Sequence, residues 1–195
     1  MLQLEIHRAI AETYRRGFAD TDLQSLEKAT GVNKSGLYFE FESKEDLFLA
    51  SLRYYLQRRP ESALLSSEPL GWRNIEDLLH AALSSPDGQR GCLAVNSMRE
   101  LAILLSAANK VVAKSLVKIK QLLVKNIKVE QTKMSPEAVA CIVATFFSVL
   151  CVEQNMRISR SASACKIRQF MHILPSFSVK TSHLQALSRF VRPPE

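Results

Sequence analysis

The sequence contains few residues that break helices and few that mark a specialised class of protein. Only 6 glycines and 7 prolines occur among its 195 residues, which excludes a collagen-like or low-complexity chain. Hydrophobic residues make up 47% of the chain and charged residues 23%, a balance that is not typical of disorder. We therefore expect a globular protein of one or two domains with a substantial core.

Cysteine and histidine are scarce and widely spaced, with four of each. No C-x-x-C pair and no H-x-x-x-H spacing occurs, so neither a disulfide framework nor a zinc site is predicted. We expect reduced thiols that fill the core, and no metal or cofactor. The cysteines are Cys92, Cys141, Cys151 and Cys165.

Long hydrophobic runs are also missing. The longest uncharged stretch, from Ala138 to Val152, has 15 residues, whereas about 18 to 20 are needed to cross a bilayer. It predicts a buried helix. The first 12 residues alternate charged and apolar side chains and lack the basic and apolar regions of a secretory signal. We expect a cytosolic protein with no membrane partner.

The net charge of +7 is unevenly distributed. Residues 1–58 carry −1 and residues 59–195 carry +8, and no acid occurs between Leu101 and Val129. Both a solvated helix face and an anion-attracting surface fit this basic segment, so charge alone does not predict nucleic-acid binding. Its lysines are Lys110, Lys114, Lys118, Lys120, Lys125 and Lys128.

Apolar residues recur with helical spacing nearly throughout, which predicts an all-α fold. Near the N-terminus we expect a first helix ending near Gly17 and a second from a T-x-x-Q capping box at Thr21 to Gly31. A third helix should run from Asn33 to about Glu40. Further helices are predicted from Ser43 towards Pro60 and over about 75–83, 91–105, 107–128, 136–156, 163–174 and 182–191.

Two short helices joined by a turn with a glycine, within residues 21–41, have the arrangement of a helix-turn-helix, whose second helix enters the major groove of DNA. Two neighbouring helices of an ordinary helical bundle can show the same spacing of apolar residues, so the spacing alone does not distinguish the two arrangements. Apolar residues that can face a shared core are Leu26, Ala29, Val32, Leu37 and Phe41. Residues that can face outward and bind bases or phosphates are Asn33, Lys34, Ser35, Gly36 and Tyr38, with Lys44 at the next helix start.

The first 55 residues or so resemble the N-terminal DNA-binding domain of the TetR family of regulators. The matching pattern comprises Val32, Lys34, Leu37, Tyr38, Phe41, Ser43, Lys44, Glu45 and Leu47. The resemblance implies a phosphate contact for Thr21, base contacts for Lys34, Ser35 and Gly36, and backbone contacts for Tyr38 and Lys44. It divides the chain into a DNA-binding domain, residues 1–45, and a ligand-binding and dimerisation domain, residues 46–195.

Two acids depart from the family pattern. Glu27 stands where a small alanine is usual, and Glu40 stands where a neutral or basic residue facing phosphate is common. An acid near phosphate repels DNA unless it meets a cytosine amine or a cation. These residues favour an alternative, a helical interaction module that binds DNA weakly.

For the remainder of the chain the resemblance implies an effector pocket and a dimer of two-fold symmetry, with recognition helices about 34 Å apart. Pocket residues, chosen as aromatic and polar groups of the kind that line ligand sites, are Tyr55, Trp72, Asn96, Met98 and Phe146. The predicted dimer interface comprises Val139, Ile142, Val143, Phe146, Phe147, Leu150, Ile167, Phe170, Met171 and Leu174.

The sequence therefore predicts a homodimeric repressor that binds a pseudo-palindromic operator in double-stranded DNA and is released by a small-molecule effector. An activator is equally compatible, because it also needs DNA binding and a change of state. An enzyme is disfavoured, because the sequence has no G-x-S-x-G, phosphate-binding loop, dinucleotide fingerprint or H-E-x-x-H motif.

Overall fold

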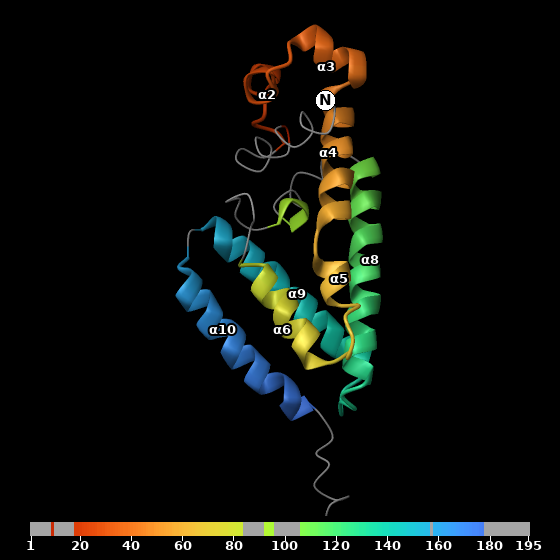
Figure 1. Cartoon of the computed structure of the whole chain (residues 1–195), viewed down its shortest axis with the longest axis vertical. Coiled ribbons are helices and arrows are strands. Elements are labelled where there is room, and N and C mark those ends of the chain that lie inside the picture. The colour runs from red at the N-terminus through yellow and green to blue at the C-terminus, as the bar shows by residue number, and fades with distance from the viewer. Residues whose placement is uncertain (1–8, 10–17, 84–91, 96–105, 157, 178–195) are drawn as a thin grey trace, which may run out of the picture.

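The computed structural model describes residues 9, 18–83, 92–95, 106–156 and 158–177, and every helix or strand element within these ranges is a helix (Figure 1). The predicted all-α fold is confirmed. In chain order the helices are α2 (Leu23–Thr30), α3 (Lys34–Glu40), α4 (Lys44–Arg58), α5 (Glu61–Leu64), α6 (Trp72–Ala81), α8 (Ser106–Lys128), α9 (Pro136–Asn155), α10 (Arg160–Ile173) and the 3₁₀ helix η1 (Leu174–Phe177).

Side-chain caps fix the positions of the first short helices. Asp22, and not Thr21 as the capping box predicted, accepts the amide N–H of Ser25 at 2.7 Å and begins α2. Gly31 ends α2 with φ 77°, a left-handed conformation that favours glycine. Asn33 then accepts the N–H of Gly36 at 2.8 Å and begins α3. The turn between α2 and α3 is therefore set by local hydrogen bonds.

Helix α4 joins the two parts of the molecule. At its N-terminal end Phe48 packs on Phe18 with ring centroids 4.9 Å apart, next to α2 and α3. It then runs alongside α8, and α5 follows it (Figure 1). The same helix thus contacts the helix-turn-helix at one end and the C-terminal core at the other.

The C-terminal part is built around α8, which contacts α4, α5, α6 and α9. A buried amide joins three of its segments. The Asn126 carbonyl oxygen accepts the N–H of Gly71 at 3.0 Å and the side-chain amide of Asn74 at 2.9 Å. Its amide group donates to the carbonyl oxygens of Leu65 and Leu122 at 2.8 and 2.9 Å. These bonds hold α6 and the residues after α5 against α8.

Most helix boundaries agree with the predicted ranges to within a few residues. The chief difference is α5, a four-residue helix within the predicted connection 60–70. The predicted first helix, apart from the buried Ala9, and the predicted helix over 182–191 lie outside the described residues, as does most of the one predicted over 91–105.

Helix α9 is less buried than the sequence predicts. One face, including Val139 and Val143, is fully buried, whereas Val149 and Val152 on another face are exposed. Within the described residues, its segment Pro136–Gln154 is the one helical stretch long and apolar enough to cross a membrane by length and composition, which for a single helix is weak evidence. The expectation of a buried helix therefore holds for one face of α9 and not for the other.

Candidate nucleic-acid interface and effector cavity

Helix α3 presents a polar and aromatic face to solvent. Leu37 and Phe41 are buried against the domain core, which turns Lys34, Ser35 and Tyr38 outward, where they are exposed. The ammonium of Lys34 lies 5.9 Å from the centroid of the Tyr38 ring, a distance at which a cation is attracted to an aromatic face. The outward direction predicted for these three residues agrees with the structure.

Phe39 is an exposed residue that the sequence reasoning missed. Its side chain is 87% exposed, although an aromatic of this size is normally at least partly buried. Its position between Leu37 and Phe41 gives the signal, because the two core residues are four apart and the residue midway between them faces away. The outer face of α3 therefore carries two exposed aromatic side chains, Tyr38 and Phe39.

Gly36 is required by packing within the domain. A Cβ atom at this position would lie 2.7 Å from Cγ1 of Val32 and 3.3 Å from the cap oxygen of Asn33. Val32 or the cap would have to move to admit a side chain. Asn33 is exposed, but its oxygen is engaged in the cap.

Thr21 and Lys44 lie differently from what the resemblance implies. Thr21 is only 1% exposed, so its side chain cannot reach a phosphate in this structure, and its predicted phosphate contact is corrected. The ammonium of Lys44 lies 4.4 Å from the centroid of the Phe18 ring, which supports the junction between the domain core and α4. Lys44 is still partly exposed.

The two acids that depart from the family pattern have different surroundings. A carboxylate oxygen of Glu27, on α2, accepts the backbone N–H of Lys34 at the start of α3. Glu27 thus satisfies a free amide at a helix N-terminus, where negative charge is favourable. Glu40 is exposed in the last turn of α3.

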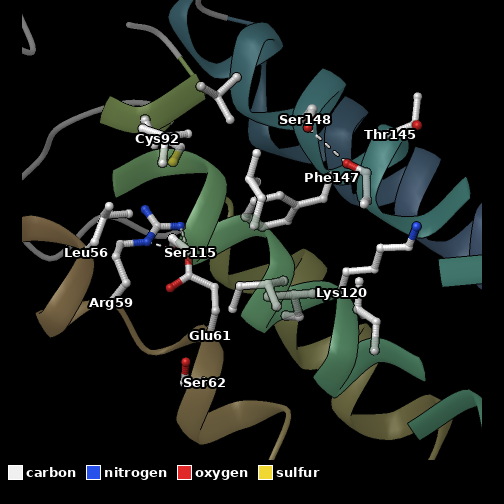
Figure 2. Close-up of a pocket in the computed structure, with 18 residues that line it drawn as sticks. Leu56, Arg59, Glu61, Ser62, Cys92, Ser115, Lys120, Thr145, Phe147 and Ser148 are labelled. Carbon is white, nitrogen blue, oxygen red and sulfur yellow. Dashed lines mark hydrogen bonds and ion pairs between the residues drawn. The ribbon is translucent and has the colours of Figure 1, made fainter. Parts of the chain in front are cut away.

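A cavity of about 290 Å³ lies beyond the C-terminal end of α4, among α4, α5, α8 and α9 (Figure 2). Its wall is mainly apolar, and its charged side chains are Arg59, Glu61 and Lys120. A largely apolar concave site with a few polar groups is typical of a small-molecule pocket. Apolar residues on its wall include Leu56, Leu78, Val112, Ile119, Leu123 and Phe147.

None of the three predicted pocket residues that the structure describes, Tyr55, Trp72 and Phe146, lines this cavity. Tyr55 lies behind the wall, where its hydroxyl accepts hydrogen bonds from Arg59 and from the N–H of Leu93. The backbone N–H of Trp72 donates to Glu130 at 2.8 Å, at the other end of α8. Phe146 stacks on Phe170 with centroids 4.0 Å apart. Asn96 and Met98 lie outside the described residues.

A largely buried ion pair and one thiol form the polar side of the cavity, and a second thiol lies behind the wall. Arg59 bonds to a carboxylate oxygen of Glu61 and to the Tyr55 hydroxyl. Burial disfavours the charge of Arg59, but Cys92, Glu61 and Tyr55 together raise its pKa above the usual value. The charged form of Arg59 is therefore the stable one inside the protein.

Cys92, on the wall, and Cys151, behind it on α9, interact through their thiols. The hydrogen bond from Cys151 lowers the pKa of Cys92 to about 6, against the effect of burial and with help from Arg59. The same interaction and burial raise the pKa of Cys151. Cys92 and Cys151 are buried as predicted, whereas Cys141 and Cys165 are exposed, so the prediction of core thiols is wrong for these two.

The predicted dimer interface is half inside the chain's own core. Phe147 lines the cavity, and Ile142, Phe146, Phe170 and Met171 are partly exposed. The other five, which are fully buried within one chain and so cannot contact a partner, are Val139, Val143, Leu150, Ile167 and Leu174. The exposed hydrophobic residues of α9 and α10, which were not predicted, are Val149, Val152 and Ile173, together with Met156 directly after α9.

Known proteins resemble this chain in sequence over about half of its length and in fold over most of it. The HTH-type transcriptional regulator YezE of Bacillus subtilis is 30% identical over 102 residues, or 50% of this chain and 53% of that protein. The HTH-type transcriptional repressor ComR of Escherichia coli is 30% identical over 103 residues, or 50% of this chain and 49% of that protein. The chain thus spans about half the length of these relatives.

Two solved structures extend the likeness to most of the chain. A cysteine mutant of the TetR family transcriptional regulator CifR, complexed with 26 bp double-strand operator DNA, has a TM-score of 0.75 at 23% identity, covering 86% of this chain and 94% of that one. A TetR family regulator from Cytophaga hutchinsonii has a TM-score of 0.75 at 19% identity, covering 92% and 95%.

The fold and the arrangement of α2, turn and α3 define a helix-turn-helix protein with a helical C-terminal domain. Residues 6–51 match the model of the bacterial regulatory proteins of the tetR family. The match to the tetR family thus covers the N-terminal DNA-binding part of the chain, and the fold of TetR family regulators extends over most of the remainder.

Proposed function

We propose that this protein is a cytosolic transcriptional repressor that binds a pseudo-palindromic operator as a homodimer and leaves it when a small-molecule effector binds. The observation that carries the proposal is the outer face of α3. This helix is fixed by the caps of Asn33 and Glu27 and presents Lys34, Tyr38 and Phe39 to solvent. A rigid, exposed helix with donors and apolar groups can enter the major groove.

The side chains of α3 suit both kinds of DNA contact. Lys34 and Ser35, in the first turn, can donate hydrogen bonds to base edges, as the first turn of a recognition helix does. Tyr38 can donate to a phosphate, and Phe39 can pack against a thymine methyl group. The CifR structure that this fold resembles was solved with double-strand operator DNA, which supports the same role here.

Helix α4 supplies a physical route from the cavity to α3. Leu56 of α4 lines the cavity, and Arg59, directly after α4, is paired with Glu61 on the cavity wall. Phe48 of the same helix packs on Phe18 beside the helix-turn-helix. An effector that binds better to one position of α4 shifts the population towards that position and changes the spacing of the recognition helices.

The apolar surface of α9 and α10 supports the dimer. Val149, Val152 and Ile173 are exposed although they are large and apolar. A patch of this kind on a soluble protein is characteristic of an interface. Burying the patch against a second copy with two-fold symmetry forms a four-helix arrangement from α9 and α10.

Glu27 does not favour the alternative of an interaction module, because its carboxylate is bound to the Lys34 amide. Glu40 remains exposed on α3, so its effect on DNA binding depends on the groups it meets there.

Titrations of DNA binding test the proposal. The protein is titrated against the DNA upstream of its own coding region, and against a random pool, at low and moderate salt. Lys34→Ala should weaken binding by about 1 to 3 kcal/mol and relax one base preference. The matched control is Lys133→Ala, which removes an exposed lysine after the far end of α8, and it should bind like wild type.

Phe39→Ala should also weaken binding without lowering thermal stability, because the removed side chain is exposed. If both α3 variants bind like wild type, α3 is not the reading helix. If no sequence is enriched from the random pool, the protein is an interaction module.

A further inference from the structure

We propose that the ligand of the cavity is an uncharged, mostly apolar molecule that donates one hydrogen bond, from a hydroxyl or N–H group, to Oε2 of Glu61. The inference rests on the proposed function, in which the cavity is the effector site, and it names the chemistry of the effector.

Glu61 is a buried carboxylate with one oxygen left over. The residue is 6% exposed, and its Oε1 accepts a hydrogen bond from Arg59. Its Oε2 is buried and has no hydrogen-bond partner, and the residue lies on the cavity wall beside Arg59 (Figure 2). Leaving such an oxygen unpaired costs about 1 to 3 kcal/mol, or more for a charged group. The oxygen is covered by protein in this structure, so a donor on a ligand reaches it through a small shift of the side chains on the wall, and the hydrogen bond then removes this cost.

The other polar side chains that α9 contributes to the wall are already engaged. The hydroxyl of Thr145 donates to the carbonyl oxygen of Cys141 at 2.9 Å, and that of Ser148 donates to Ala144 at 2.9 Å. Among the buried side-chain oxygens of the described cavity wall, Glu61 Oε2 alone lacks a partner. Glu61 therefore supplies the buried acceptor of the site, and the hydroxyls of Ser62 and Ser115 complete its polar wall.

The charges of the wall favour a neutral ligand. Arg59 already balances Glu61 in a largely buried ion pair, so a cation entering the cavity would lose its hydration without gaining an unpaired counter-charge. An anion would meet the unpaired oxygen of Glu61 directly. Lys120 is exposed and can pair with solvent ions, so it does not require an anionic ligand.

The remaining wall and the volume set the size of the ligand. The residues around Glu61 are mainly aliphatic and aromatic, so the body of the ligand gains free energy from burial of apolar surface. The volume of about 290 Å³ lies at the small end of the range for ligand pockets. An alkylphenol with a short chain meets these requirements.

The test compares para-butylphenol with para-butylanisole, its methyl ether, which has the same apolar body but no donor. Binding to the full-length protein is measured by calorimetry and by thermal shift, without DNA. The phenol should bind about 10-fold more tightly than the ether, the difference that one hydrogen bond to a charged group supports. Butylbenzylammonium and butylbenzoate, the charged analogues, should both bind more weakly than the phenol.

Glu61→Gln, which removes the charge and replaces one oxygen by an amide group, should reduce the preference for the phenol to about 2-fold or less. The matched control is Glu137→Gln, at an exposed carboxylate in the first turn of α9, and it should keep the preference. If Glu61→Gln does not fold, the comparison of the four probes on the wild type still decides.

Three results would overturn the inference: equal affinity for phenol and ether, tighter binding of either charged analogue, or no saturable binding of the phenol up to about 1 mM. The proposed function is judged separately, by adding the phenol to the complex with operator DNA. If the phenol binds the cavity with the expected preference but DNA affinity is unchanged, the effector role fails and the chemistry of the site stands.

Discussion

At the scale of single residues, Asn126 shows how a buried polar side chain can organise a helical core. It is fully buried, and its amide makes hydrogen bonds to Gly71, Asn74, Leu65 and Leu122. All four groups depend on the Asn126 side chain for a hydrogen bond. Removing one member of the network therefore leaves another polar group in the core without its partner. A lone asparagine in an amphipathic helix gave no signal of this role in the sequence.

Replacing this residue should be among the most destabilising single changes in the C-terminal part. Asn126→Leu keeps the branched shape of the side chain but leaves the Gly71 amide and the Leu65 carbonyl unpaired, so the free energy of unfolding should fall by about 2 to 4 kcal/mol. Urea unfolding followed by circular dichroism measures the change. Lys125→Leu, at the exposed neighbour, is the control, and an equal loss there would contradict the role of the network.

Cys92 predicts a pH dependence of stability. Its pKa is lowered from 9.0 to about 6 in the folded protein, first by the hydrogen bond from Cys151. Between about pH 6 and 9 the unfolded chain holds a proton that the folded chain has released, so the free energy of unfolding rises with pH across this window. The contribution is lost as pH falls through the folded pKa. The slope can approach about 1.4 kcal/mol per pH unit.

The measurement is urea unfolding of wild type and Cys92→Ser at about pH 5.5, 7 and 8.5. The gap in stability between the two should widen with pH. Cys141→Ser, at an exposed thiol, should follow the wild type at every pH. A gap that stays constant would mean that Cys92 is protonated throughout.

At the scale of helices, the sequence was informative where local chemistry determines structure. Asn33 and Ser43 were each predicted to begin a helix, and the structure caps α3 and α4 with them. Caps depend on a few neighbouring residues, which a single sequence displays. The outward face of α3 followed from the spacing of Leu37 and Phe41 for the same reason.

The faces of α9 and α10 were harder to predict. Helix α9 is apolar nearly all round, so periodicity marks it as a helix without saying which side meets its own chain. Val143 and Leu150 were therefore placed at a partner interface although they are fully buried, and Val149 was missed although it is exposed. The residues that line the cavity were mispredicted for a similar reason. Tertiary packing, which the sequence does not display, brings Cys92 next to Arg59 and Glu61.

Helix α9 also yields a prediction about assembly. Val149→Glu places a charge on the apolar surface that we propose to be shared by two copies, and it should convert a dimer to a monomer in sedimentation experiments. A charge inside an interface must be desolvated without a partner, which costs several kcal/mol. Val117→Glu is matched, because Val117 is 57% exposed on α8 and Val149 is 50% exposed. It should leave the assembly unchanged.

A Val149→Glu variant that remains dimeric would place the interface elsewhere on the chain. If Val117→Glu were the variant that dissociates, α8 and not α9 would form the interface.

At the scale of the whole molecule, a symmetric dimer makes a prediction about the DNA and not about the protein. Two recognition helices related by a two-fold axis contact half-sites about one helical turn apart. Inserting about 5 bp between the half-sites rotates one of them to the opposite side of the duplex and should reduce affinity to the non-specific level. Inserting about 10 bp returns the second half-site to the same side of the duplex but leaves the two half-sites too far apart for the two recognition helices.

Footprinting on the three operators measures this effect. A monomer that reads a single half-site would bind all three alike, and that result would contradict the dimeric proposal while leaving α3 as the reading helix.

The length of α4 has a geometric consequence. Its 15 residues form a rod about 22 Å long, attached to the cavity at one end and to Phe18 at the other. Tilting such a rod by about 5° about its cavity end displaces the far end by about 2 Å, and in the proposed dimer two-fold symmetry doubles the change in separation to about 4 Å. In the proposed mechanism, a small tilt set by the effector at the cavity end is thereby magnified to a misfit that a groove of fixed pitch does not tolerate.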